Sequence, residues 1–231
     1  MRLSREIEPI NWRYALGELI LIVVGISLAL AGNSWYENRQ EGLEELQVLS
    51  QFREALENDQ EEFQRIYETA RDVHQKVTAL LAHMSSEEPY GTNVEPYILA
   101  VTRWRGVRAN VAAYEALKAR GFDLISDESL RLDLIEYYEE IAPNLRDIYL
   151  NDRQMVTEQV MPYFFKNLHM ADIWKFVPND YEQLRIDPYF RNLTMYKLGR
   201  LESFMLPRFE RALTRIEELQ TKIAAEVERR I

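Results

Sequence analysis

Two patterns of hydrophobic and polar residues follow one another along the chain, first a continuous apolar run and then a helical repeat. From Leu19 to Ala31 every residue is apolar or small except Ser27, and further apolar residues extend this run back to Tyr14. From residue 43 onward, apolar residues recur instead at alternating steps of three and four. The first pattern is typical of a membrane-spanning helix, and the second of a long helix with one buried face.

The first segment, residues 14–35, is predicted to span a membrane. Its rise at about 1.5 Å per residue gives roughly 31 Å, which matches a hydrocarbon core of about 30 Å. Trp12 and Tyr14 mark one end and Trp35 and Tyr36 the other, as aromatic belts do. Its large aliphatic residues contribute roughly −3 to −5 kcal/mol toward insertion. Glu18 lies near one end, where a carboxylate costs less than at the bilayer centre.

A cleaved secretory signal is the alternative for this segment. The apolar run ends in Ala29-Leu30-Ala31, which fits a signal peptide core followed by an A-x-A cleavage site. However, aromatic anchors and a continuous helical pattern follow that site. We therefore expect a retained membrane anchor.

Basic residues near the span predict its orientation. Arg2, Arg5 and Arg13 precede it. Arg39 is the only basic residue among residues 36–50, which also contain several glutamates. Positive residues favour the cytoplasmic side. We therefore expect a bacterial inner-membrane protein with a cytoplasmic N-terminus (1–13), one transmembrane helix (14–35) and a periplasmic helical-bundle domain (36–231). A second apolar run of comparable length does not occur, so the predicted protein is single-pass.

The strongest periodic signal predicts a helix from about residue 43 to residue 84, roughly 60 Å long. Asp59 is the one exception along its seam, and the apolar seam positions are Leu49, Phe52, Leu56, Phe63, Ile66, Ala70, Val73, Val77, Leu80 and Met84. The seam is expected to be buried by the same chain in an antiparallel bundle. An intermolecular coiled coil is the alternative.

Shorter elements are predicted after this helix. They are a loop at 85–96, helices at 97–105 and 110–119, a helix from 126 to about 155, an irregular stretch with short helical turns at 162–186, and a final helix from 187 onward. Gly121 is expected to close one helix, Ser126 or Asp127 to begin the next, and Asp187 to cap the last. Pro143 is expected to kink or split its helix, and Pro207 to introduce a kink. The predicted fold class is all-α, with a single N-terminal transmembrane helix followed by a long helix and an extramembrane helical bundle.

Composition narrows the function classes. The chain has 231 residues, of which 47% are hydrophobic and 29% charged, as in a folded protein with one extramembrane domain. A net charge of −10 makes nucleic acid a poor partner. The absence of cysteine excludes disulfides, thiolate zinc sites and a cysteine nucleophile.

Residues that could support catalysis are few. His74, His83 and His169 are the only histidines, and none has a second histidine at metal-ligand spacing. Nucleophile-elbow, phosphate-loop and zinc-protease motifs do not occur in the sequence. We therefore expect no catalytic residues, no metal site and no cofactor, and hence a protein that is not an enzyme.

A compact basic cluster stands out in the acidic domain. Arg103, Arg105 and Arg108 flank Trp104, and such a cluster can bind lipid phosphates or an acidic partner. An ion-pair network with the acidic long helix is the alternative.

Three tyrosines at helical spacing are a second candidate site. Tyr114, Tyr137 and Tyr138 could line a ligand pocket. Tyrosines in such patterns more commonly pack in the core or at its edge.

Small residues in the anchor suggest a helix–helix contact. Glu18, Gly25 and Gly32 are seven residues apart, with Ala29 beside them. Small residues let two helices approach closely, and an intramembrane carboxyl group is less costly when it is hydrogen-bonded. The alternative is that Glu18 reaches the cytoplasmic interface and the glycines are incidental.

The anchor also carries a short signature, namely Gly17-Glu18, Val23-Val24-Gly25-Ile26, Ala29, Asn33 and Trp35. Less specific matches follow at Tyr114-Glu115-Ala116-Leu117, Gly121, Leu124-Ile125, Leu130 and Tyr137-Tyr138. Together they resemble an uncharacterised bacterial family, a domain of unknown function with an N-terminal membrane anchor. This resemblance implies a membrane-anchored helical protein and no particular activity.

Two function classes are consistent with these patterns. The favoured one is a non-catalytic, membrane-anchored periplasmic module that acts as an oligomeric scaffold or accessory subunit. Its expected partners are the lipid bilayer and a second copy or another membrane protein. The alternative is a sensor-like helical domain that binds a small ligand, although such receptors use a second span to carry the signal inward.

Overall fold

The computed structural model describes residues 12–230, and the side chains of residues 16–230. These residues are all-α apart from one two-stranded hairpin, so the predicted fold class is confirmed. The chain divides into two compact units, 1–47 and 48–231, and helix α1 (Trp12–Met84) contributes to both. Arg2 and Arg5 lie outside the described residues, as do the side chains of Trp12, Arg13 and Tyr14.

The described part of the first unit is one helical stretch with its apolar side chains exposed. Residues 16–41 are all exposed, and the aliphatic side chains between Leu16 and Leu30 keep 48% to 74% of their surface accessible. This is the one helix among the described residues that is long and apolar enough to cross a membrane. A helix that is apolar on all sides requires an apolar environment, which lipid supplies.

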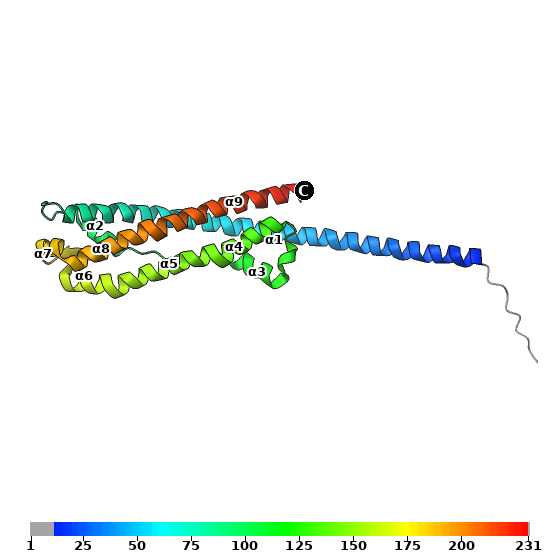
Figure 1. The fold of residues 1–231 in the computed structure, drawn as a ribbon, viewed down its shortest axis with the longest axis horizontal. Helices are drawn as coiled ribbons and strands as arrows, with labels where there is room; N and C mark the ends of the chain where they lie inside the picture. Colours follow the sequence, from blue (N-terminus) through cyan, green and yellow to red (C-terminus); the bar gives the residue numbers. More distant parts are fainter. Residues whose placement is uncertain (1–11, 231) are drawn as a thin grey trace, which may run out of the picture. The chain divides into compact units, whose positions relative to one another are not determined.

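The second unit is built from three long helical runs (Figure 1). The first is α1 from Val48 to Met84. The second comprises α4 (Glu128–Glu136), η2 (Tyr137–Ile141), α5 (Ala142–Met155), η3 (Val156–Val160) and α6 (Met161–Asn167). The third comprises α8 (Pro188–Arg200), η4 (Leu201–Met205) and α9 (Leu206–Arg230).

Contacts between the runs give their directions. Tyr67 and His74 of the first run contact Glu210 and Glu202 of the third in reverse order, so these two runs are antiparallel. The second run is parallel to the first, because the chain returns between them through α2 (Glu95–Ala100) and the non-helical residues 103–111 (Figure 1). The predicted antiparallel packing is therefore correct for the third run and wrong for the second.

The predicted seam of α1 is buried by the same chain. Its ten apolar positions between Leu49 and Met84 each expose 4% of their surface or less. They belong to two core clusters, one that includes Phe52 and Phe63 and another that includes Val77 and Leu80. The expected burial of this seam within its own chain is therefore observed.

Three prolines are accommodated by wide helical turns and not by breaks. Pro143, Pro162 and Pro207 each follow a five-residue π-helical segment and occupy the second position of the next α-helix. Proline lacks the amide proton for an α-helical bond and crowds the preceding turn, and a π-turn relieves this conflict within a continuous helix. The kinks predicted at Pro143 and Pro207 thus take the form of π-bulges.

The predicted helix ends are mostly correct. The Asp127 carboxylate accepts a hydrogen bond from the Leu130 amide at 2.8 Å, and Asp187 accepts one from the Tyr189 amide at 2.8 Å. Gly121 ends α3 (Ala112–Arg120) with φ of 112°, a conformation that glycine adopts without strain. The helix predicted to reach residue 105 ends at Ala100 instead.

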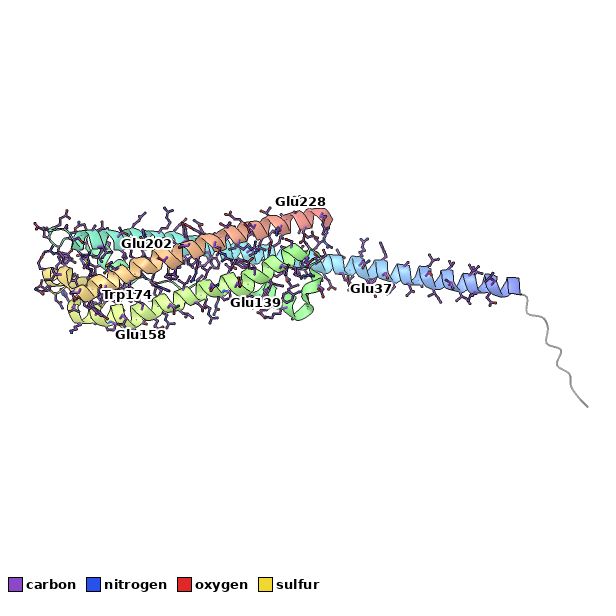
Figure 2. The ribbon with its side chains drawn as sticks, in the orientation of Figure 1. Glu37, Glu139, Glu158, Trp174, Glu202 and Glu228 are labelled. Carbon is purple, nitrogen blue, oxygen red and sulfur yellow. The ribbon has the colours of Figure 1, made fainter. Side chains whose placement is uncertain are left out.

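Residues 162–186 contain a hairpin that the sequence pattern did not indicate. Strands β1 (Leu168–Asp172) and β2 (Lys175–Pro178) pair antiparallel between α6 and α7 (Tyr181–Ile186). Ile173 and Trp174 form the turn, and Trp174 has φ of 58° where glycine or asparagine is usual. Figure 2 places Trp174 among the side chains at this end of the bundle. Because the turn lacks its usual residues, sequence rules do not detect the hairpin.

Candidate functional site

The predicted helix-contact residues of the anchor are all exposed. Glu18, Gly25, Ala29 and Gly32 lie on α1. Apart from the neighbouring backbone of the same helix, a Cβ atom added at Gly25 or Gly32 would meet no described atom within 4 Å. Their spacing places them along one stripe of the helix. The surface is therefore open to a second helix, and the described chain itself does not cover it.

The predicted basic cluster lies on the segment that connects the first two runs. Arg103, Trp104, Arg105 and Arg108 are exposed, with Trp104 retaining 42% of its surface. Arg105 forms a long contact of 3.5 Å with Glu62 of α1, in the manner of the predicted ion-pair alternative.

The Trp104 indole is held in place by neighbours on α5. It packs on the Tyr149 ring with centroids 5.5 Å apart, and the Arg153 guanidinium lies 5.7 Å from its ring centroid. Gly106 passes so close to Tyr149 that an added Cβ would lie 3.5 Å from that ring. The segment therefore lies directly on the bundle.

A buried ion pair fixes the start of this segment. Lys197 of α8 donates to both carboxylate oxygens of Asp152 on α5, at 2.8 and 2.7 Å, and to the Arg103 carbonyl at 2.6 Å. The two side chains are 1% and 2% exposed. Burial lowers the pKa of the Lys197 ammonium below its ordinary value, and the Asp152 carboxylate opposes this shift. The pair joins the second run, the third run and the connecting segment at one point.

A cavity of about 270 Å³ lies under the connecting segment. Exposed residues Arg103, Trp104 and Arg105 contribute to its lining, whereas Arg108 does not. Most of the remaining lining is apolar and comes from α1, α5, η4 and α9. The structure thus brings three of the four predicted basic-cluster residues to one cavity.

The three predicted tyrosines lie together in the core. Tyr114 and Tyr138 stack with ring centroids 4.8 Å apart, and Tyr137 packs edge-on against Tyr138 at 4.8 Å. They are exposed by 3%, 0% and 4% in the order Tyr114, Tyr137 and Tyr138. The Tyr114 hydroxyl donates to Glu139, a residue that Figure 2 labels, at 2.9 Å. The three rings pack against one another, as side chains in a protein core do.

Asp59, the exception in the α1 seam, is a buried hydrogen-bond acceptor. It is 3% exposed, and its carboxylate accepts from the Asn110 amide at 2.7 Å and the Tyr137 hydroxyl at 2.9 Å. Burial raises the pKa of Asp59, and these two hydrogen bonds offset part of that rise. One carboxylate therefore joins the first run, the connecting segment and the π-helical turn of the second run.

Replacing Asp59 by asparagine is expected to remove one component of the pH dependence of stability. A raised native pKa stabilises the fold below the ordinary value of 3.8, and this contribution is lost as pH rises through the raised pKa. Urea unfolding from pH 3.5 to 7 should therefore show that the free energy of unfolding of Asp59→Asn rises relative to that of the wild type as pH increases. A constant difference between the two proteins across this range would contradict a raised pKa.

The three histidines each contact a side chain from another part of the chain. His74 contacts Glu202, the buried His83 contacts the Tyr181 hydroxyl, and His169 contacts Asn179. Groups of three or more histidine, aspartate or glutamate residues suited to a metal ion do not occur among residues 16–230.

No protein-family model, curated protein or solved structure matches this chain. The family resemblance of the anchor signature therefore stays a prediction.

Sequence reasoning missed the Asp152–Lys197 pair, although a signal for it was present. Asp152 lies on the same helix face as the buried residues Ile148 and Met155. Lys197 lies on the same helix face as the buried residues Phe190 and Leu201. A charged residue at a buried helical position requires a partner. The sequence could thus have marked both residues, but not their pairing.

Proposed function

We propose that the protein is a non-catalytic, membrane-anchored helical module that acts as an oligomeric scaffold or accessory subunit. The observation that carries this proposal is the exposed apolar stretch of α1, since a lipid bilayer would cover these side chains. The α1 seam is buried within its own chain. A partner must therefore bind either the anchor or the outer surface of the bundle.

The hairpin end of the bundle supports a role in protein contacts. Phe165, Met170, Ile173 and Trp174 are 65%, 50%, 80% and 64% exposed. Clustered exposed apolar side chains commonly mark interaction sites. Trp174 also holds a left-handed conformation that is costly for a residue with a side chain.

The proposed location of the bundle is the bacterial periplasm, with the N-terminus in the cytoplasm and the anchor in the inner membrane. The distribution of arginines around residues 14–35 supports this orientation. We expect a cysteine introduced at Thr92, in the loop after α1, to react in intact cells with a thiol reagent that does not cross the inner membrane. Labelling only after lysis would reverse the proposed orientation.

The proposed contact within the membrane runs along Glu18, Gly25, Ala29 and Gly32. We expect Gly25→Ile combined with Gly32→Ile to dissociate the complex purified from native membranes in mild detergent, because the larger side chains separate the helices. Light scattering and mass spectrometry of co-purifying proteins measure the loss.

Ile22→Ala combined with Leu30→Ala is the matched control, because it changes two residues of the same helix to smaller ones and therefore does not separate the helices. This variant should retain the wild-type mass and co-purifying proteins. If the double glycine variant also retains them, the proposed contact does not exist. An absence of any complex in the wild type would instead contradict the proposed function itself.

A further inference from the structure

The cavity under the connecting segment lies where the two core clusters meet. Ile66 and Phe209 of its lining belong to the first cluster, and Ala70, Val73 and Leu201 belong to the second. Protein interiors are normally packed as densely as organic crystals, with few voids larger than a water molecule. The lining of a larger void lacks contact atoms on one side, so an apolar body in it gains those contacts.

The size of the cavity limits what can enter. Its volume of about 270 Å³ is just under the roughly 300–1,000 Å³ of drug-sized ligand pockets. Apolar cavities of about 150 Å³ already bind benzene. The cavity therefore suits a single ring or a short chain.

The buried ion pair in the wall does not itself call for a charged ligand. Lys197 directs hydrogen bonds to both Asp152 oxygens and to the Arg103 carbonyl, so its three ammonium protons have acceptors within the protein. Its role is to position Arg103 at the edge of the cavity. A ligand placed deeper inside would contact mainly apolar side chains.

The edge of the cavity is basic in an acidic protein. The backbone positions of Arg103 and Arg105 are set by the Lys197 hydrogen bond and by the packing of Trp104 on Tyr149. The contact between Arg105 and Glu62, at 3.5 Å, is long. A guanidinium group binds a carboxylate through paired hydrogen bonds. The exposed Arg103 and Arg105 side chains can therefore bind an anionic group at the edge of the cavity.

We propose that this cavity binds a small carboxylate with an apolar body. The body occupies the space between α1, α5 and α9, and the carboxylate lies at Arg103 and Arg105 beside Trp104. This site lies wholly within residues 48–231 and does not depend on the proposed anchoring or partner contacts.

Fluorine NMR titration of the full chain in lipid nanodiscs tests this site. The probes are 4-fluorophenylacetate and its neutral isostere 4-fluorophenylacetamide, with empty nanodiscs as the reference for lipid partitioning. We expect saturable binding of the acid. Arg103→Gln combined with Arg105→Gln should weaken acid binding at least tenfold and leave amide binding within twofold.

Three further variants separate the cavity from general surface charge. Arg108→Gln alters the same segment outside the cavity and should change acid binding less than twofold. Ala70→Phe fills the cavity and should abolish binding of both probes while the melting temperature stays at or above the wild-type value, with Ala70→Leu as a milder filling variant.

Three results would overturn the site. They are an absence of saturable acid binding to the wild type, equal loss of acid binding in Arg108→Gln and in the Arg103/Arg105 variant, and acid binding that persists in a folded Ala70→Leu or Ala70→Phe protein.

Discussion

Lys197→Met is expected to lower the free energy of unfolding of the bundle by about 3–5 kcal/mol, because it leaves the Asp152 carboxylate buried without a counter-charge. The substitution also removes the donor to the Arg103 carbonyl. Methionine has a similar length, so lost packing contributes little. Urea unfolding of the full chain in detergent, followed by near-ultraviolet circular dichroism, measures the change.

The matched controls distinguish an unpaired charge from lost volume. Lys197→Met combined with Asp152→Leu removes both charges and should recover most of the lost stability, since buried pairs can be replaced by apolar residues. Lys118→Met breaks an exposed pair with Glu139 and should leave the free energy of unfolding nearly unchanged. A Lys197→Met protein as stable as the wild type would show that Asp152 is not buried as described.

Leu21→Arg combined with Val24→Arg is expected to release the protein from membranes. Each arginine near the bilayer centre costs about 2.5–3.5 kcal/mol, and the aliphatic residues of the segment contribute only roughly −3 to −5 kcal/mol in all. The net free energy of membrane insertion therefore becomes unfavourable. Extraction of isolated membranes with alkaline carbonate should leave the wild type in the pellet and move the variant to the supernatant.

Leu43→Arg combined with Leu132→Arg is the matched control for this experiment. Both leucines are exposed, by 61% and 56%, and both lie outside the apolar run. The control protein should remain in the pellet. Equal retention of the Leu21/Val24 variant would mean that residues 14–35 do not anchor the chain.

The buried charges of the bundle illustrate how much a helical pattern predicts. Asp59, Asp152, Lys197 and Glu226 all occupy buried faces of long helices, and each has a charged or hydrogen-bonding partner. A periodic pattern identifies such positions, because a charge interrupts an otherwise apolar face. It does not identify the partner. Tyr137 is 78 residues from Asp59, and Lys197 is 45 residues from Asp152.

The candidate site was predicted only in part for a related reason. Arg103, Trp104 and Arg105 form a basic cluster that is visible in the sequence, but the cavity beside them arises from residues on α1, α5, η4 and α9. Cavities depend on how distant side chains fill the space between helices. Composition and spacing along one helix contain no such information.

Local interactions explain what could be deduced from residue order alone. The exposed apolar stretch of α1, the buried seam of α1, the caps at Asp127 and Asp187 and the helix end at Gly121 each depend on neighbours within a few turns. The parallel placement of the second run, the Ile173–Trp174 hairpin and the Asp152–Lys197 pair instead depend on contacts between segments far apart in the chain. Such contacts form only when whole helices pack, because packing alone selects which of many distant groups meet.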